Sequence, residues 1–141
     1  MSISPRTFRL LMLVLAALLL GVALAIRAVS SGRLESNGSL EQYSGNALYA
    51  SMVYTGVLFL WPRISPLLAG GIAIGFCWLV EFSQLTCIPA FLSARSLLAR
   101  LVLGVQFDLT DVAWYPAGIV PLVVLHWFLR TRIEVGQPSR R

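Results

Sequence analysis

Two uninterrupted apolar stretches, LLMLVLAALLLGVALAI at residues 10–26 and ISPLLAGGIAIGFCWLV at residues 64–80, decide the fold class of this chain. Each is seventeen residues long and has no charged side chain, close to the roughly 20 apolar residues that an α-helix needs to cross a bilayer. Over all 141 residues, 57% are hydrophobic and 12% are charged, against roughly 25% charged in a typical soluble domain. So short a chain has too little polar surface to cover these stretches in water. The sequence therefore predicts an all-α membrane protein.

Turn and charge signals predict a four-transmembrane-helix bundle that forms a single membrane domain over residues 1–141. The helices are expected at approximately residues 7–29, 45–61, 65–86 and 110–129, with a short interfacial helix at approximately 92–103 between the third and fourth and a flexible tail at 132–141. The polar stretch 30–45 indicates an exposed loop, inside which the second helix starts near Tyr43. Pro62 marks a tight connection after the second helix and Pro89 is expected to stop the third, because proline cannot donate a backbone hydrogen bond in a helix interior.

The first apolar stretch has an alternative interpretation as a signal peptide. Arg6 and Arg9 precede it, and Ala23-Leu24-Ala25 resembles an Ala-x-Ala cleavage site. A retained helix fits better, because the apolar run is long for a signal core and ends in Arg27 as a membrane helix does.

The cysteines, and the absence of familiar catalytic motifs, predict no cofactor and no metal. Cys77 and Cys87 have no metal-binding spacing. On one continuous helix they would be separated by about 15 Å, too far for a disulfide, so both are expected to be free thiols. No nucleophile–His–acid set and no phosphate loop is visible.

The basic residues predict the orientation in the membrane. All eleven are arginines, scattered singly near helix ends, which argues against nucleic-acid binding and suggests a high-GC bacterial genome. Seven lie at the two termini and the middle turn, and four lie in the other two loops. The positive-inside rule then places both termini in the cytoplasm, with the chain as a multi-pass protein of the bacterial inner membrane.

Glu81 is the one acidic residue expected deep within a membrane helix. It lies about 7–8 Å from the outer end of the third helix, where an ionised carboxylate costs a few kcal/mol unless it is paired, protonated or hydrated. Gln84 lies one turn later on the same face, so the two form a polar stripe. The pair is interpreted either as part of a functional site or as an interhelical hydrogen bond that fixes the bundle.

Two arginines of the outer segment are candidate partners of Glu81. A guanidinium can hold a carboxylate or a phosphate through two parallel hydrogen bonds. Arg95 is expected either to pair with Glu81 or to lie among lipid phosphates, and for Arg100 the lipid interpretation is favoured.

The start of the fourth helix adds a second acidic group. Asp108 is expected to cap this helix, and Asp111 suits the positive end of the helix dipole in its first turn. Asp111, Tyr115 and Gly118 recur at helical spacing, so this face is expected to meet Glu81 at the outer mouth of the bundle.

Two further features have plain structural interpretations. Gly71 and Gly75 form a Gly-x-x-x-Gly pattern, which predicts close helix packing. His126 lies beside Trp127 near the inner end of the fourth helix and is interpreted as a membrane-interface residue. It would lie across the membrane from the acidic groups, which argues against a catalytic triad.

The order of these residues resembles that of the Domain of Unknown Function 2809 family of small bacterial membrane proteins, over nearly the whole chain and including Arg27. The matching positions are Tyr43-Ser44-Gly45-Asn46-Ala47-Leu48-Tyr49-Ala50, Glu81-Phe82-Ser83-Gln84, Arg95, Gly104, Phe107, Asp111-Val112-Ala113-Trp114-Tyr115 and Gly118. The order is also similar to that of the wider VanZ-like group, whose founding members are associated with glycopeptide resistance.

This resemblance implies a membrane location and one shared polar site. The site would comprise Asn46, Glu81, Gln84, Arg95, Asp111 and Tyr115. Asn46 stands where the family has Asp, so this chain has one carboxylate fewer and a proton or metal role there is in doubt. The resemblance supplies no activity.

The leading functional hypothesis is recognition of an envelope lipid headgroup or surface-active compound at this outward-facing site. The alternative is a structural or accessory membrane subunit whose polar cluster only stabilises the bundle. An enzyme that uses Glu81 and Asp111 as acid and base, and proton-coupled transport, are further alternatives; enzymatic activity is not expected. The lipid bilayer is the expected partner, and the oligomeric state is open.

Overall fold

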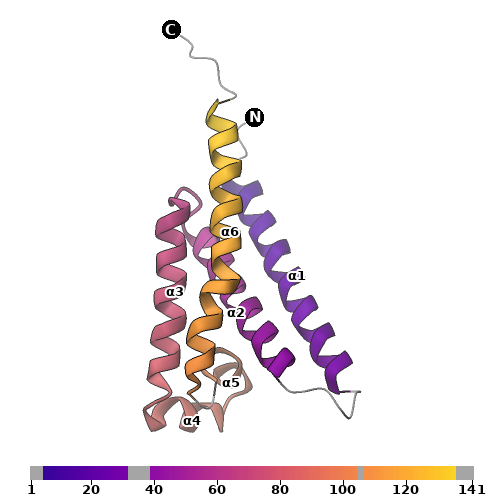
Figure 1. Cartoon of the computed structure of the whole chain (residues 1–141), viewed down its shortest axis with the longest axis vertical. Helices are drawn as coiled ribbons and strands as arrows, with labels where there is room; N and C mark the ends of the chain where they lie inside the picture. Colours follow the sequence, from indigo (N-terminus) through magenta and orange to yellow (C-terminus); the bar gives the residue numbers. More distant parts are fainter. Residues whose placement is uncertain (1–4, 32–38, 105–106, 136–141) are drawn as a thin grey trace.

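The computed structural model describes residues 5–31, 39–104 and 107–135, and these residues are mainly helical. The elements, drawn in Figure 1, are α1 (Pro5–Ser31), α2 (Ser39–Leu60), α3 (Pro66–Ser83), α4 (Cys87–Ser93), α5 (Leu97–Leu103) and α6 (Leu109–Val135). The expected all-α fold class is confirmed for this part of the chain.

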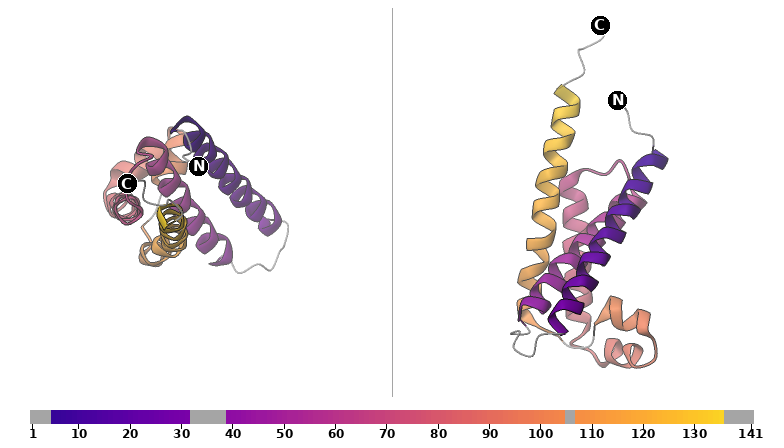
Figure 2. Two further views of the ribbon diagram at one scale, coloured as in Figure 1. Left: turned by 90° about the horizontal axis from the view of Figure 1, so that it is seen from above. Right: turned by 90° about the vertical axis from the view of Figure 1, so that its right-hand side faces the viewer.

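Four long helices run side by side, and two short helices lie across one end of them (Figures 1 and 2). α2 is the central long helix, since it contacts α1, α3 and α6. The beginning of α1 and the end of α6 lie at one end of the bundle, and α4 and α5 lie at the other.

Three of the described helices are long and apolar enough to cross a membrane: Arg6–Ile26, Pro66–Ser83 and Leu109–Thr131. Their outward faces are apolar, with Leu10, Leu79 and Phe128 each more than 60% exposed. Such contiguous apolar surface is unusual on a soluble monomer and is compatible with a membrane protein. α2 does not meet the same criterion of length and composition.

Several helix boundaries differ from those expected. α2 begins at Ser39, so the second half of the expected loop is helical. α6 continues to Val135, so the first residues of the expected flexible tail are helical too, and 136–141 lie outside the described residues. Hydropathy underestimates these helices because backbone hydrogen bonds within a helix form equally well in polar sequence beyond the apolar stretch.

The structure has two short helices, α4 and α5, where one interfacial helix was expected. The third long helix, α3, ends before Pro89, so this proline does not stop it. α3 ends at Ser83, and the Thr86 hydroxyl caps α4 by accepting from the Ile88 N–H at 3.4 Å. Pro89 is the third residue of α4, where its missing N–H costs no intrahelical hydrogen bond. Ser96 caps α5 in the same way through the Ala99 N–H at 3.3 Å. Two separate capping residues thus divide the segment.

Polar side chains of the central helix face its neighbours. Ser51 and Thr55 are buried, and the Ser51 hydroxyl donates to the carbonyls of Ala47 and Gly118 at 2.9 and 3.0 Å. The Tyr54 hydroxyl bonds to Nδ1 of His126 at 2.9 Å. His126 is therefore part of an α2–α6 contact.

Close packing of the helices depends on glycines other than the predicted pair. Gly71 and Gly75 have open space where a Cβ would lie, so the predicted packing role of this pair is wrong. A Cβ on Gly70 would lie 2.6 Å from Cγ2 of Val123, and a Cβ on Gly118 would collide with the carbonyl oxygen of Ala47. Spacing alone cannot identify such glycines, because the face that a helix buries is set by its neighbours.

Pro116 lies inside α6 and leaves the carbonyl of Val112 without its usual intrahelical donor. The indole Nε1 of Trp78 on α3 donates to this carbonyl at 3.1 Å. A buried or lipid-facing carbonyl without a partner is costly in a membrane, so this hydrogen bond stabilises both the α3–α6 contact and the proline within α6.

Replacing Gly118 by Ala tests this packing. We expect Gly118→Ala to lower the stability by about 1–3 kcal/mol, because α2 and α6 must move apart to accommodate the methyl group. Gly75→Ala is the matched control: its Cβ enters open space and alanine favours a helix over glycine, so stability should be unchanged or slightly higher. Thermal unfolding in detergent measures both, and equal effects would contradict the packing described here.

Candidate functional site

A cavity of about 330 Å³ lies near the α5 end of the bundle, between α2, α3, α5 and α6. Its lining combines polar and apolar groups: Gly45, Asn46, Tyr49, Val80, Glu81, Gln84, Val102, Leu103, Gly104, Asp111 and Tyr115. Its volume falls within the roughly 300–1,000 Å³ typical of small-molecule sites.

Glu81 forms one wall of this cavity and joins two helices. Its side chain is 1% exposed. Oε1 accepts from the Asp108 N–H at 2.8 Å, and Oε2 accepts from the Tyr115 hydroxyl at 2.7 Å. The carboxyl group also lies at the amino end of α6, where the helix dipole favours negative charge. These two hydrogen bonds explain how the bundle tolerates a buried acidic residue.

Asp108 performs its expected capping role. Its Oδ1 accepts from the Thr110 N–H at 2.8 Å, directly before the first residue of α6. Because its own N–H donates to Glu81, the cap of α6 is also attached to the end of α3. Asp111 follows in the first turn and lines the cavity.

The end of α5 forms another wall, and its carbonyls accept hydrogen bonds from side chains of α2, of α4 and of Gln84, which directly follows α3. Tyr49 donates to the carbonyl of Val102 at 2.9 Å, and Nε2 of Gln84 donates to that of Leu103 at 2.7 Å. The Ser93 hydroxyl donates to the carbonyl of Gly104 at 2.6 Å. Carbonyls at a helix end have no intrahelical partner, so these three hydrogen bonds hold α5 over the cavity.

Gly104 is required in this wall for two reasons. Its φ of 67° lies in the left-handed region that other residues rarely adopt, and a Cβ would lie 2.6 Å from Nε2 of Gln84. The sequence offered a signal for this position, because Gly104 is among the residues that resemble the family.

Two amide atoms at the cavity are buried without a hydrogen-bond partner among the described residues: Nδ2 of Asn46 and Oε1 of Gln84. The Asn46 nitrogen is a hydrogen-bond donor, and the Gln84 oxygen is an acceptor. A buried polar group left unpaired costs on the order of 1–3 kcal/mol. Both atoms are shielded from solvent, so a turn of either side chain toward the cavity would favour a bound group that accepts from Asn46 and donates to Gln84.

Five of the six predicted site residues meet at this cavity: Asn46, Glu81, Gln84, Asp111 and Tyr115. Arg95 does not. Its guanidinium lies 4.0 Å from the centroid of the Phe91 ring, and it is absent from the cavity lining. Of the two alternatives for Arg95, the pairing with Glu81 is therefore wrong, because the turn between α4 and α5 directs Arg95 outward; its place among lipid phosphates stays a prediction. Tyr49 was not among the predicted site residues, although it lies within the family-like stretch 43–50.

The lining has two carboxyl groups, and no arginine or lysine is among its described residues. No group of three or more His, Cys, Asp or Glu residues arranged to hold a metal occurs within the described part of the chain. Because both oxygens of Glu81 already accept hydrogen bonds, this residue is better placed to hold α6 than to exchange protons with a substrate.

An apolar groove adjoins the polar cavity and shares Gly45, Tyr49 and Val102 with it. The groove has a volume of about 440 Å³ and lies between α1, α2 and α5, lined by Leu20, Ala23, Leu24, Ile26, Ser44, Gly45, Tyr49, Met52, Leu98 and Val102. The polar cavity and the apolar groove thus meet at these three residues.

Residues 36–119 match the family described as protein of unknown function (DUF2809). The chain belongs to this family. The match includes every residue of the polar cavity and leaves all of α1 outside, so it extends over less of the chain than expected and does not include Arg27. No solved structure matches the chain significantly.

The residues common to the DUF2809 resemblance and the cavity include both partners of the buried hydrogen bond between Glu81 and Tyr115. We expect Tyr115→Phe to lower the stability by about 1–3 kcal/mol, because Oε2 of Glu81 loses its donor. Glu81→Leu should cost at least as much, since it removes the acceptor for two donors. The double variant should be less destabilised than the sum of the single effects, by about 1–2 kcal/mol.

Unfolding of the four proteins in detergent gives this coupling energy. Glu81→Gln is the matched control, because its amide can still accept from the Asp108 N–H and donate to the Tyr115 oxygen. It should be milder than Glu81→Leu. Additive effects of Glu81→Leu and Tyr115→Phe would contradict the described hydrogen bond.

Proposed function

We propose that this member of the DUF2809 family is a multi-pass membrane protein in which α2 is a fourth crossing helix. Three crossings alone would leave the start of α1 and the end of α6 on opposite sides of the bilayer, whereas both lie at one end of the bundle (Figure 1). α2 is 22 residues long, which corresponds to about 33 Å. It runs between the other long helices, where polar residues such as Ser51 and Thr55 are covered by protein.

The orientation follows from the arginines. The positive-inside rule places the arginine-rich end of the bundle in the cytoplasm of a bacterial cell. The polar cavity, with α4 and α5 beside it, would then open toward the outer leaflet of the inner membrane.

Native and introduced cysteines test this topology. Cys87 is exposed at the start of α4 and Cys77 is buried, so a membrane-impermeant thiol reagent should label Cys87 in intact spheroplasts. Arg63→Cys in a Cys87→Ser background should be labelled only after the membrane is opened. Labelling of both positions from the same side would refute the four-crossing arrangement.

We propose further that the polar cavity binds the headgroup of an amphiphile, an envelope lipid or a surface-active compound, whose apolar chain lies in the adjoining groove. The observation that supports this most directly is the pair of unpaired amide atoms of Asn46 and Gln84 in a cavity that meets an apolar groove. A headgroup that accepts from Asn46 and donates to Gln84 would satisfy both atoms once the two side chains turn toward the cavity.

The charge of the cavity narrows the headgroup chemistry. Glu81 lines it, and no cation is among the described lining residues. An anionic phosphate would meet like charge here without a basic partner, whereas an ammonium group would meet complementary charge. The preferred ligand is therefore an amphiphile with an amine head that also has hydrogen-bond acceptors.

The alternative is a structural or accessory subunit, supported by the hydrogen bonds of Glu81 to Asp108 and Tyr115. Asn46 separates the two proposals. If it serves the bundle, replacing it lowers stability. If it serves a ligand, replacing it removes the unpaired buried amide nitrogen and leaves the empty protein equally or more stable.

Asn46→Leu therefore has two expected results. The purified variant should unfold at the same or a higher temperature than the original protein. Its affinity for dodecylamine, measured below the micelle concentration through the shift in unfolding temperature, should fall by about tenfold, as expected for one lost hydrogen bond of about 1.4 kcal/mol.

The controls are a second ligand and a second variant. Dodecyl phosphate has the same chain with an anionic head and should bind more weakly than dodecylamine. Thr55→Val removes a polar group from the same helix outside this cavity and should leave dodecylamine binding unchanged. Equal affinity for the two amphiphiles, or unchanged dodecylamine binding to Asn46→Leu, would reject the proposed headgroup site.

A further inference from the structure

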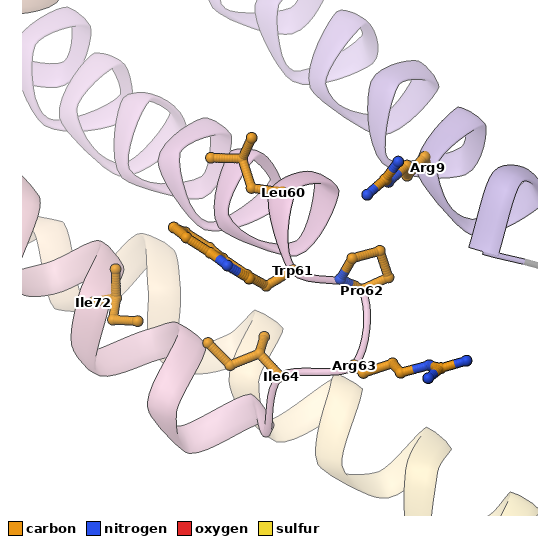
Figure 3. Close-up of a pocket in the computed structure, with 7 residues that line it drawn as sticks. All are labelled: Arg9, Leu60, Trp61, Pro62, Arg63, Ile64 and Ile72. Atoms are coloured by element: carbon orange, nitrogen blue, oxygen red, sulfur yellow. The ribbon is translucent and has the colours of Figure 1, made fainter.

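A second groove, of about 590 Å³, lies at the opposite end of the bundle from the polar cavity, beside the turn between α2 and α3. Figure 3 shows the seven residues that line it: Arg9, Leu60, Trp61, Pro62, Arg63, Ile64 and Ile72. Two of them are arginines, four are aliphatic or proline residues, and one is a tryptophan. The composition therefore differs from that of the polar cavity in the sign of its charge.

Arg9 and Arg63 come from different parts of the fold, and Figure 3 shows Pro62 between them, with Arg9 on one side and Arg63 on the other. Arg9 belongs to α1, and its guanidinium lies 5.9 Å from the ring centroid of Phe59. No carboxyl group lines the groove among its described residues, and neither guanidinium forms an ion pair within the part of the chain that the structure describes. Two such guanidinium groups favour an anionic ligand.

The other side of the groove is apolar. Leu60 and Trp61 are 57% and 55% exposed, and the Trp61 ring lies on the side of Pro62 that also holds Ile64 and Ile72 (Figure 3). Tryptophan favours the boundary between the headgroups and the hydrocarbon of a bilayer. The groove thus has a basic part and an apolar part at a helix end, the arrangement that suits a lipid lying across this boundary.

Arg130 from α6 fixes the turn without entering the groove lining. Its Nη1 donates to the carbonyl of Ile64 at 3.1 Å, and its Nη2 donates to that of Arg63 at 3.2 Å. The backbone of the turn is therefore held against α6. This constraint reduces the entropy that would be lost when the turn binds a ligand.

From this geometry we propose that the groove binds an anionic phospholipid. The lipid phosphate lies between Arg9 and Arg63, and an acyl chain covers Trp61 and Ile72. Basic pockets between transmembrane helices bind the headgroups of anionic lipids by the same chemistry. The proposal is independent of the amine-headgroup site, because it concerns a different end of the bundle and ligands of opposite charge.

The double variant Arg9→Gln/Arg63→Gln tests the site. Dioleoylphosphatidylglycerol, added to the purified full-length protein in a neutral detergent, should bind the original protein, measured as a rise in unfolding temperature and as a lipid adduct in native mass spectrometry. In the double variant, its affinity should fall by roughly tenfold to thirtyfold, the effect of two lost charges near a lipid headgroup.

The matched control Arg95→Gln/Arg100→Gln removes the same charge from the other end of the bundle and should leave phosphatidylglycerol binding unchanged. Dioleoylphosphatidylcholine should bind more weakly because its head has no net charge. Inorganic phosphate at the same concentration should give no rise in unfolding temperature, since it lacks the chain. If Arg9→Gln/Arg63→Gln does not fold, Arg9→Lys/Arg63→Lys replaces it. This variant keeps both charges but cannot form bidentate hydrogen bonds to a phosphate, so its affinity for phosphatidylglycerol should fall several-fold.

The proposal is overturned if phosphatidylglycerol binds the groove variant as tightly as the original protein. It is also overturned if both arginine pairs contribute equally, because binding would then reflect net charge alone. A response to inorganic phosphate equal to that for the lipid would assign the site to a free anion instead.

Discussion

The arrangement of this protein depends on the carboxyl group of Glu81. With 1% of its surface exposed, it must find donors inside the protein, because an unpaired carboxylate in a low-dielectric interior is very costly. It finds them at the Asp108 N–H and the Tyr115 hydroxyl. One side chain of α3 thereby sets both the position where α6 begins and the rotation of α6 about its axis. The polar cavity exists because these helices meet in this register.

The same constraint, that polar groups need partners, explains the other unusual features of the bundle. The terminal carbonyls of α5 receive donors from Tyr49, Gln84 and Ser93, and the carbonyl freed by Pro116 receives the Trp78 indole. The unpaired amide atoms of Asn46 and Gln84 contrast with these pairings. They lie beside an apolar groove, which is why we assign them to a ligand and Glu81 to the support of the site.

The candidate site could be predicted from sequence where residues lie on the helical faces that meet in the bundle. Glu81 with Gln84, and Asp111 with Tyr115, have helical spacing, and the family resemblance added Asn46. Arg95 shows where this reasoning fails. Attraction between opposite charges predicts a pair, but the turn between α4 and α5 decides where the guanidinium lies, and its described contact is the Phe91 ring. The predicted packing role of Gly71 and Gly75 was wrong for the same reason, since spacing does not say which face of a helix is buried.

By itself, the sequence determined the helical class, the long apolar helices, the family and most members of the polar cluster, because hydropathy and helical periodicity are local properties of the chain. The division of residues 87–103 into two helices depended on caps at Thr86 and Ser96, and the partner of His126 depended on the packing of α2 against α6. Only the tertiary structure decided that Glu81 is fully hydrogen-bonded while Asn46 is not. A side chain's partners come from segments distant in sequence, and only packing brings those segments together.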